Sequence, residues 1–290
     1  MKAVEGAARR SALLLPIVVV GGLLAVPLAL TAVVSFWERA GVRVRPAFTV
    51  ASYEAFVAGA RLVVLERSAL VALGATAVSL AIAYPIAYFL AWHASRRAAR
   101  VALMLFSVPF VVNYIIRTFS WAYLLGRTGP VNSTLIALGL VDRPVDWLLF
   151  SHFSVFVGLV TSYMPFMIFP LWLSLAGIDR RLLEASFMSG ATPAQTFLRV
   201  TLPLSLPGVF AAIVFGFVGV FGESAVPVIL GGVGYELMGN TITSAMDVLN
   251  YPLAAAMSTV VVLCMAILLA VWFAAFDLRS FLGKMVRWRV

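Results

Sequence analysis

Two ionisable residues stand inside long apolar runs of the sequence. Glu223 ends the segment GVFGE, and Arg117 lies within NYIIRTFSW. An ionisable group at the centre of a bilayer costs at least about 2.5 kcal/mol, so such groups face a wet cavity or pair with other polar groups. Glu223 therefore has two interpretations: a structural carboxylate that pairs or accepts backbone hydrogen bonds, or a carboxylate that lines a solute path.

Arg117 can be interpreted in the same two ways. If it lies near the outer end of its helix, its guanidinium can extend to water while its stem stays in the apolar layer. Otherwise it faces an inner cavity or pairs with Glu223. Trp121 and Tyr163 mainly indicate interfacial or packing aromatics, and with Glu223 and Arg117 they complete the candidate solute path.

A long polar stretch, DRRLLEASFMSGATPAQTFLRVTLP, separates two apolar blocks at Asp179–Pro203. Asp179 is expected to cap a first short helix, and Gly190 to end it in a left-handed conformation. The segment Thr192–Gln195 has the pattern of a capping box with proline at the first helical position, and Pro203 is expected to end this second helix. The sequence predicts a helical hairpin with a tight corner at residues 190–191, shaped as a docking element.

Known catalytic patterns are missing from the sequence. It contains no G-x-x-x-x-G-K-[ST], no H-E-x-x-H and no G-x-S-x-G motif. Its two histidines, His93 and His152, and its one cysteine, Cys264, are too few to supply the ligand set of a typical zinc site. We expect no enzyme activity, and no metal or cofactor bound by this chain.

The composition indicates an all-α membrane protein. The chain of 290 residues is 63% hydrophobic and 11% charged, whereas soluble domains are roughly 45–50% apolar and 25% charged. Its net charge of +9 does not indicate nucleic acid as a partner, because the basic residues cluster beside apolar blocks. We expect residues 1–290 to form a single transmembrane domain in contact with membrane lipid.

Six apolar runs are each long enough to cross a bilayer. A polar loop at residues 37–67 separates the first and second runs, and another at 126–151 separates the third and fourth. Pro165 and Pro170 are expected to bend the fourth run. The predicted spans are Ser11–Phe36, Ser68–Trp92, Val101–Leu125, Phe153–Ala176, Ser205–Leu230 and Pro252–Phe276.

The basic residues predict which ends of these spans face the cytoplasm. Six spans put both termini on one side, together with residues 93–100 and 177–204. Thirteen of the 21 Lys and Arg residues lie on that side, including four in the tail at 279–289, against seven in the loops of the other side. By the positive-inside rule both termini and the helical hairpin are cytoplasmic.

The helical hairpin resembles a cytoplasmic loop of the form E-A-A-x-x-x-G-x9-I-x-L-P, found in the membrane subunits of binding-protein-dependent ABC importers. Glu184, Ala185 and Ser186 precede Gly190 at the family spacing, and VTLP at 200–203 falls at the I-x-L-P positions. Ser186 for Ala and Val200 for Ile are the departures. Four segments, NYIIRTFSW, YMPFMIFP, QTFLRVTLPLSLPG and GESAVPVILGG, look like the first permease subunit of spermidine/putrescine importers.

This resemblance implies a fold and a set of partners. The fold would be that of a type I ABC importer permease in the bacterial inner membrane. A periplasmic solute-binding protein would deliver a polyamine to a path formed by this chain and a second, different permease subunit. An ABC ATPase dimer would bind ATP and Mg. The residues that would couple to it are Glu184, Ala185, Ser186, Gly190, Thr192, Pro193 and Pro203.

Two alternatives stay open at this point. The subfamily tends to have Tyr-Ala where this chain has Phe119-Ser120, and often Phe where it has Ser224, so the solute could be another cationic or amino-acid-like molecule. Glu223 also motivates an ion-coupled secondary carrier that works alone, although no inverted repeat is evident. An intramembrane enzyme would need catalytic groups that the sequence does not supply.

Overall fold

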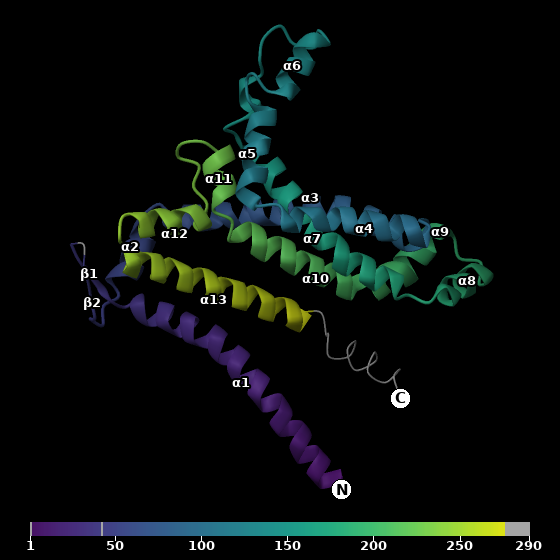
Figure 1. Ribbon diagram of the computed structural model, residues 1–290, viewed down its shortest axis with the longest axis horizontal. Helices are drawn as coiled ribbons and strands as arrows, with labels where there is room; N and C mark the ends of the chain where they lie inside the picture. The colour runs from purple at the N-terminus through teal and green to yellow at the C-terminus, as the bar shows by residue number, and fades with distance from the viewer. Residues whose placement is uncertain (1, 42, 276–290) are drawn as a thin grey trace. The chain divides into compact units, whose positions relative to one another are not determined.

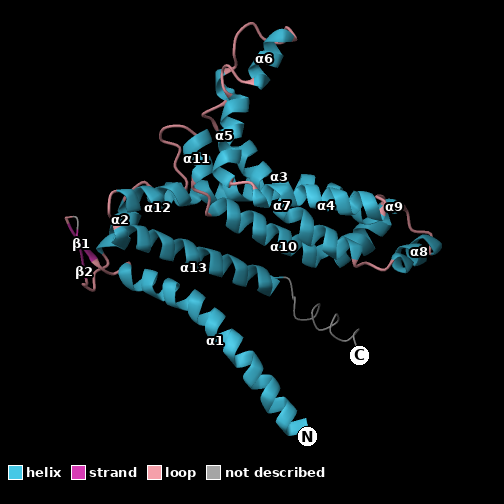
Figure 2. Ribbon diagram, viewed as in Figure 1, coloured by secondary structure: helices cyan, strands magenta, loops and turns pink. Residues whose placement is uncertain are grey.

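The computed structural model describes residues 2–41 and 43–275, with side chains from residue 18 onwards except at 42, 272, 273 and 275. Within this part the chain is helical apart from loops and one small ribbon of strands, β1 (Glu38–Ala40) and β2 (Arg43–Arg45) (Figure 2). The all-α class is thus confirmed. The chain folds as two compact units, Met1–Leu62 with Ile242–Val290, and Val63–Thr241.

The first unit contains α1 (Lys2–Val34), the β1–β2 ribbon, α2 (Ala51–Ala58) and α13 (Tyr251–Ala275). Both α1 and α2 pack against α13 (Figure 1). The ribbon is antiparallel, with Arg39 opposite Val44. Arg39 Nη2 donates a hydrogen bond of 2.9 Å to the carbonyl oxygen of Val248. This bond fastens the ribbon to the turn before α13.

The second unit is built on helices that run side by side. Helices α4 and α10 pack on α7 (Figure 1), and α3 joins them through the core. Short helices α8 and α9 lie at one end of α10, and α11 lies at the other. The helices are α3 (Arg61–Trp92), α4 (Arg96–Val111), α5 (Tyr114–Leu125), α6 (Pro130–Ala137), α7 (His152–Ala176), α8 (Arg180–Met188), α9 (Pro193–Thr196), α10 (Leu202–Phe221) and α11 (Ala225–Leu230), with a 3-10 turn at Asp146–Leu148 and a π turn at Phe197–Thr201. The chain passes from this unit to the first within α12 (Met238–Asp247), after Thr241.

Small side chains let the helices of the second unit approach closely. A Cβ at Gly208 would collide with the Cβ of Ser174 and the carbonyl oxygen of Pro170, and one at Gly216 would lie 2.9 Å from Met167 Sδ. Because glycine has no side chain, the backbones of the two helices can come close together at these positions. The core around them joins three helices: Ala83, Ala87 and Leu90 of α3, Met167, Ile168, Leu171 and Leu175 of α7, and Ala212 of α10.

Four helical stretches are long and apolar enough to cross a membrane: Arg61–Trp92, Asp146–Ala176, Pro193–Phe221 and Tyr251–Val271. A fifth exists if α4 is counted together with Tyr114–Ala137, from which it is bent by 97°. The first predicted span, Ser11–Phe36, overlaps α1, which ends two residues earlier at Val34 and whose described apolar part is Val18–Val34. The basic tail at 279–289 lies outside the described residues.

The third predicted span, Val101–Leu125, is wrong as a single helix. α4 ends at Val111, and α5 begins at Tyr114. Pro109 lies in the last turn of α4, and Asn113 caps α5, because its Oδ1 accepts a hydrogen bond of 2.9 Å from the Ile115 amide. Proline removes a helical hydrogen bond, and asparagine is among the preferred N-cap residues. Together they break the span.

The fifth predicted span, Ser205–Leu230, is wrong at both ends. α10 already begins at Leu202 and ends at Phe221, after which α11 starts at Ala225. Pro203 does not end the second helix of the hairpin either. The chain passes from α9 through the π turn, in which the Leu202 amide donates to the Phe197 carbonyl oxygen, and continues into α10. A proline in the first turn of a helix leaves that helix intact.

Candidate functional sites

The helical hairpin, residues 179–203, has the caps that the sequence predicts. Asp179 Oδ1 accepts a 3.0 Å hydrogen bond from the Arg181 amide at the start of α8. Thr192 and Gln195 form the capping box, with the Gln195 side chain 3.0 Å from the Thr192 amide and the Thr192 hydroxyl 3.3 Å from the Gln195 amide. Gly190 has φ +81°, a left-handed conformation that glycine adopts without penalty. The corner is therefore encoded locally.

The inner side of the helical hairpin joins its two arms. The hydroxyls of Ser186 on α8 and Thr196 on α9 lie 2.9 Å apart, and Leu183 is buried beside them. The ring of Phe197 packs edge-on against the rings of Tyr84 and Tyr88 of α3, with centroids 5.9 and 6.1 Å away. The second arm is thus held against α3, and it leads directly into α10.

The outer side of the helical hairpin is apolar and uncovered by the described part of the chain. Met188 is 89% exposed and Leu198 is 60% exposed. Leu182 and Phe187 are about half-exposed, and Glu184 is exposed on the same short helix. Apolar side chains gathered on an exposed amphipathic element are typical of a surface that binds a groove on a partner.

Glu223 lies in a break between two helices, residues 222–224, and not inside one continuous helix as predicted. Its Oε1 accepts hydrogen bonds from the amides of Ser224, Ala225 and Val226, at 3.0, 2.9 and 3.4 Å. Its Oε2 accepts a 2.7 Å hydrogen bond from the Tyr163 hydroxyl of α7. A carboxylate there also meets the positive end of a helix, since it caps the free amides of α11. Glu223 thus accepts the backbone hydrogen bonds that are expected of a structural carboxylate.

Two glycines make room for this arrangement. A Cβ at Gly219 would collide with the Tyr163 ring, and a Cβ at Gly239 would collide with the Glu223 carbonyl group. Gly219 therefore lets the tyrosine ring lie flat on α10, with its hydroxyl directed at the carboxylate. Gly216 and Gly219 thus give α10 a small-residue face that contacts α7. At Gly222 a Cβ would meet only the Val218 carbonyl oxygen, at 3.5 Å.

Arg117 lies near this pair without forming an ion pair with it. Its Nη1 donates a 3.0 Å hydrogen bond to the carbonyl oxygen of Pro109 at the end of α4, and its buried Nε has no hydrogen-bond partner. It is close enough to Tyr163 to interact electrostatically with the hydroxyl. The described side chains contain an ion pair elsewhere, between Arg127 Nε and Asp146 Oδ1 at 2.8 Å. Arg117 holds the bend between α4 and α5.

Some polar contacts could have been found from the sequence and others could not. Asn113 follows a proline and precedes an apolar run, which is the pattern of a cap. The pairing of His152 Nδ1 with the Tyr235 hydroxyl, at 2.9 Å, joins residues 83 positions apart and has no local signal. Burial raises the pKa of Tyr235 above its usual value of 10, and the nearby charge of Arg67 opposes that shift.

Trp121, the remaining residue of the candidate solute path, is half-buried on α5.

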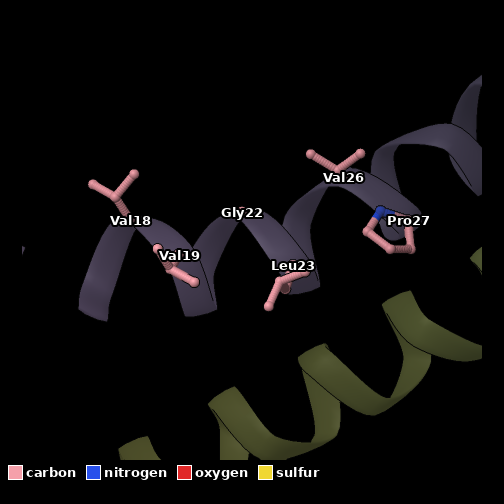
Figure 3. Close-up of a pocket in the computed structure, with 6 residues that line it drawn as sticks. All are labelled: Val18, Val19, Gly22, Leu23, Val26 and Pro27. Atoms are coloured by element: carbon pink, nitrogen blue, oxygen red, sulfur yellow. The ribbon is translucent and has the colours of Figure 1, made fainter. Parts of the chain in front are cut away.

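An apolar groove of about 460 Å³ runs along α1, between residues 18 and 27 (Figure 3). Leu23 and Pro27 point toward α13, and Val18 and Val26 point away from it. Its lining is Val18, Val19, Gly22, Leu23, Val26 and Pro27, none of which carries a reactive or charged group. No cluster of His, Cys, Asp and Glu among the described residues could hold a metal ion.

Comparison with known proteins places these features in a family. The sequence profile of the binding-protein-dependent transport system inner membrane component matches residues 67–280. The spermidine/putrescine transport system permease protein PotB of Escherichia coli (strain K12) is 34% identical over 174 residues, which cover 60% of this chain and 63% of that protein. The inner membrane ABC transporter permease protein YdcU of the same organism is 30% identical, over 78% of this chain and 76% of that protein.

A solved structure is also similar. A chain of the bacterial alginate ABC transporter, in complex with an alginate pentasaccharide-bound periplasmic protein, has a TM-score of 0.72 at 15% identity and covers 92% of this chain and 94% of that one. At this identity the likeness shows the fold alone, and it confirms the predicted permease fold. The chain matches less than two thirds, 63%, of the length of PotB.

Proposed function

The chain belongs to the family of inner membrane components of binding-protein-dependent transport systems, and we propose that it is one of two permease subunits of an ATP-driven importer. It is a multi-pass protein of the inner membrane, and a transport subunit rather than an enzyme in its own right. The observation that carries the proposal is the helical hairpin, with Gly190 at its left-handed corner and an uncovered apolar outer side.

The helical hairpin is the proposed docking element for an ABC ATPase. The exposed apolar side chains of α8 and the second arm would enter a groove on one ATPase subunit, with Glu184 and Ala185 at the contact. ATP and Mg would be held by the ATPase dimer and not by this chain. In this orientation the hairpin and both termini would be cytoplasmic, and the distribution of basic residues supports that side.

The continuous helix from α9 into α10 gives the coupling a physical route. A movement imposed at Thr192 and Pro193 would be carried along Pro193–Phe221, because a helix transmits displacement along its axis better than a loop does. The other end of that helix is the break that holds Glu223. The π turn next to Pro203 is the place where the helix can adjust, since π turns are irregular and occur often at functional sites.

The proposed solute is a polyamine, spermidine or putrescine. The similarity to PotB supports this solute class, and Glu223 supplies a carboxylate for an ammonium group. Its Oε2 accepts one hydrogen bond, from Tyr163, and a carboxylate oxygen can accept two. Oε2 of Glu223 can therefore accept a second hydrogen bond, from an ammonium group of the solute. Arg117 and Trp121 on α5 complete the proposed path, and a second permease subunit, a different chain, would form its other half.

A different solute is the runner-up. The same carboxylate would serve another cationic or amino-acid-like molecule equally well, and solute choice would then rest with the periplasmic solute-binding protein. An ion-coupled carrier working alone is the less favoured alternative, because the uncovered hairpin would have no purpose in it.

Reconstitution into liposomes tests the proposal. The chain is combined with an ATPase, a second permease and a solute-binding protein encoded beside its gene, and labelled spermidine uptake is measured with and without ATP. We expect uptake only when all partners and ATP are present, and competition by putrescine but not by neutral amino acids. Uptake by the chain alone without ATP would overturn the importer assignment. Competition by amino acids alone would overturn the polyamine assignment and leave the importer intact.

A further inference from the structure

A basic pocket lies in the second unit where two membrane-length helices, α3 and α7, end and α4 begins. Its volume is about 750 Å³, and it is formed by the end of α3, the start of α4, the end of α7 and the first residue of α8. We call it the arginine pocket. The residues that line it are Leu90, Ala91, Ala94, Arg96, Ala99, Arg100, Leu103, Trp172, Ala176 and Arg180.

The charge in the arginine pocket is not neutralised by the described chain. Arg96, Arg100 and Arg180 are all exposed, and the described side chains contain an ion pair elsewhere, between Arg127 and Asp146. Arg180 Nη2 donates a 3.3 Å hydrogen bond to the Trp92 carbonyl oxygen at the end of α3. Three guanidinium groups around one cavity present several donors in the planar geometry that suits phosphate.

The floor of the same pocket is apolar. Leu90 is buried, Leu103 and Trp172 are half-buried, and the remaining lining between the helices is alanine. A pocket for a free anion or a nucleotide phosphate would need further polar groups on its floor. Here charged groups stand above an apolar surface, which is the arrangement of a lipid headgroup above its acyl chains.

The wall beside the pocket continues this apolar surface along α4. Val101, Met104, Leu105 and Val108 are between 49% and 65% exposed, and their spacing places them on one stripe of the helix. The pocket residues Arg96, Ala99, Arg100 and Leu103 form the neighbouring stripe. An acyl chain lying on the exposed stripe would bring its headgroup to the arginines.

We propose that the arginine pocket binds an anionic glycerophospholipid of the cytoplasmic leaflet, with its phosphate on Arg96, Arg100 and Arg180. Basic pockets between membrane helices on the cytoplasmic side are known to bind such headgroups. Because Arg180 is the first residue of α8, the bound lipid joins the root of the helical hairpin to the α3–α4 turn. The leaflet rests on the orientation given under the proposed function; the binding itself does not depend on transport.

Lipid binding by the purified full chain tests this inference. The chain in detergent is titrated with phosphatidylglycerol or with phosphatidylcholine of the same acyl chains, and bound lipid is measured by native mass spectrometry. We expect phosphatidylglycerol to bind at least about tenfold more tightly, since three charges contribute. Arg96→Gln and Arg100→Gln should each weaken it about fivefold, the effect of one basic residue near an anionic lipid surface.

Arg97→Gln is the matched control, because Arg97 lies on the same turn of α4 and carries the same charge but does not line the pocket. It should change the affinity by less than about twofold. Arg100→Lys should weaken binding less than Arg100→Gln does, because it keeps the charge and loses only the planar arrangement of donors. Equal binding of the two lipids, or an equal loss in Arg97→Gln, would overturn the proposal. Full displacement by inorganic phosphate would do the same, since it would show a free-anion site. None of these results depends on ATP or on uptake.

Discussion

The helical hairpin and the break between α10 and α11 use the same local device at opposite ends of one helix. In both, a side-chain carboxylate accepts hydrogen bonds from the free amides of a short helix: Asp179 for α8, and Glu223 for α11. They differ in what surrounds the carboxylate. The hairpin is exposed and leaves an apolar side uncovered, whereas Glu223 is half-buried and also bound by Tyr163.

The hairpin is held in shape by local hydrogen bonds, whereas the break is held by packing against other helices. The hairpin keeps its form through caps and one left-handed glycine, so its outer side is free to bind a partner. The break keeps its form through contacts with α7 and α12, which two glycines make possible. Substitutions in the hairpin should therefore alter coupling more than stability. Substitutions at the break should alter stability as well.

The largest effect is expected from Gly190→Asp. At φ +81° a residue with a Cβ is strained by about 1–2 kcal/mol, and an added charge would enter the proposed docking surface. We expect the protein to insert and assemble normally but to lose ATP-driven uptake. Uptake and ATP hydrolysis per delivered solute are the measurements.

Gly139→Asp is the matched control for that substitution. Gly139 also has a positive φ, +68°, and neither glycine has an atom within 4 Å of an added Cβ. The backbone strain is thus similar, but Gly139 lies outside the helical hairpin. Normal uptake in Gly190→Asp, or an equal loss in Gly139→Asp, would contradict a docking role for the corner.

The hairpin could be predicted from the sequence because every signal in it is local. Asp179, Gly190 and the Thr192–Gln195 box act within four residues, and the structure contains each of them. The two breaks were missed although each contains a local signal, Pro109 with Asn113 in one and Glu223 in the other. Hydropathy averaged over a whole span hides a single polar residue, and length alone then predicts one span in each place.

The contacts that hold Glu223 in place could not be predicted from the sequence. Tyr163 is 60 positions away from it, and the need for glycine at 219 appears only when α7 lies against α10. Composition, motif spacing and basic-residue counts do not indicate which residues of α7 and α10 lie close together. Pro227, close behind Glu223, is the local signal that could have indicated a new helix start.

The second largest effect is expected from Gly219→Ala. The new methyl group would collide with the Tyr163 ring, and overpacking of this kind costs about 1–3 kcal/mol. We expect a lower melting temperature in detergent together with reduced uptake, since the tyrosine would be moved off Glu223. Gly222→Ala is the control, because its methyl group would meet only the Val218 carbonyl oxygen at an ordinary 3.5 Å. If both variants melted alike, the ring contact would not explain the role of Gly219.

Glu223→Gln should have a narrower effect than Gly219→Ala. The amide oxygen can still accept from the α11 amides, so we expect a loss of stability of about 1 kcal/mol, the size of one weakened hydrogen bond. The missing charge should lower uptake of a polycation by about tenfold, which corresponds to about 1.4 kcal/mol. Glu236→Gln, at an exposed carboxylate in the loop before α12, should change neither. Equal losses of assembly and uptake in Glu223→Gln would favour the structural interpretation over the solute path.

The smallest effect is expected from Ser186→Ala, which restores the residue typical of the family motif. It removes the 2.9 Å contact with the Thr196 hydroxyl, a neutral hydrogen bond of about 0.5–1.5 kcal/mol. Alanine's higher helix propensity, by about 0.5 kcal/mol, offsets part of that loss, and the threonine hydroxyl can turn to a backbone carbonyl one turn back. Uptake per ATP should therefore stay within about twofold of the unmodified protein. Uncoupling as severe as that of Gly190→Asp would instead show that the bond between the arms, and not the left-handed corner, holds the docking surface in shape.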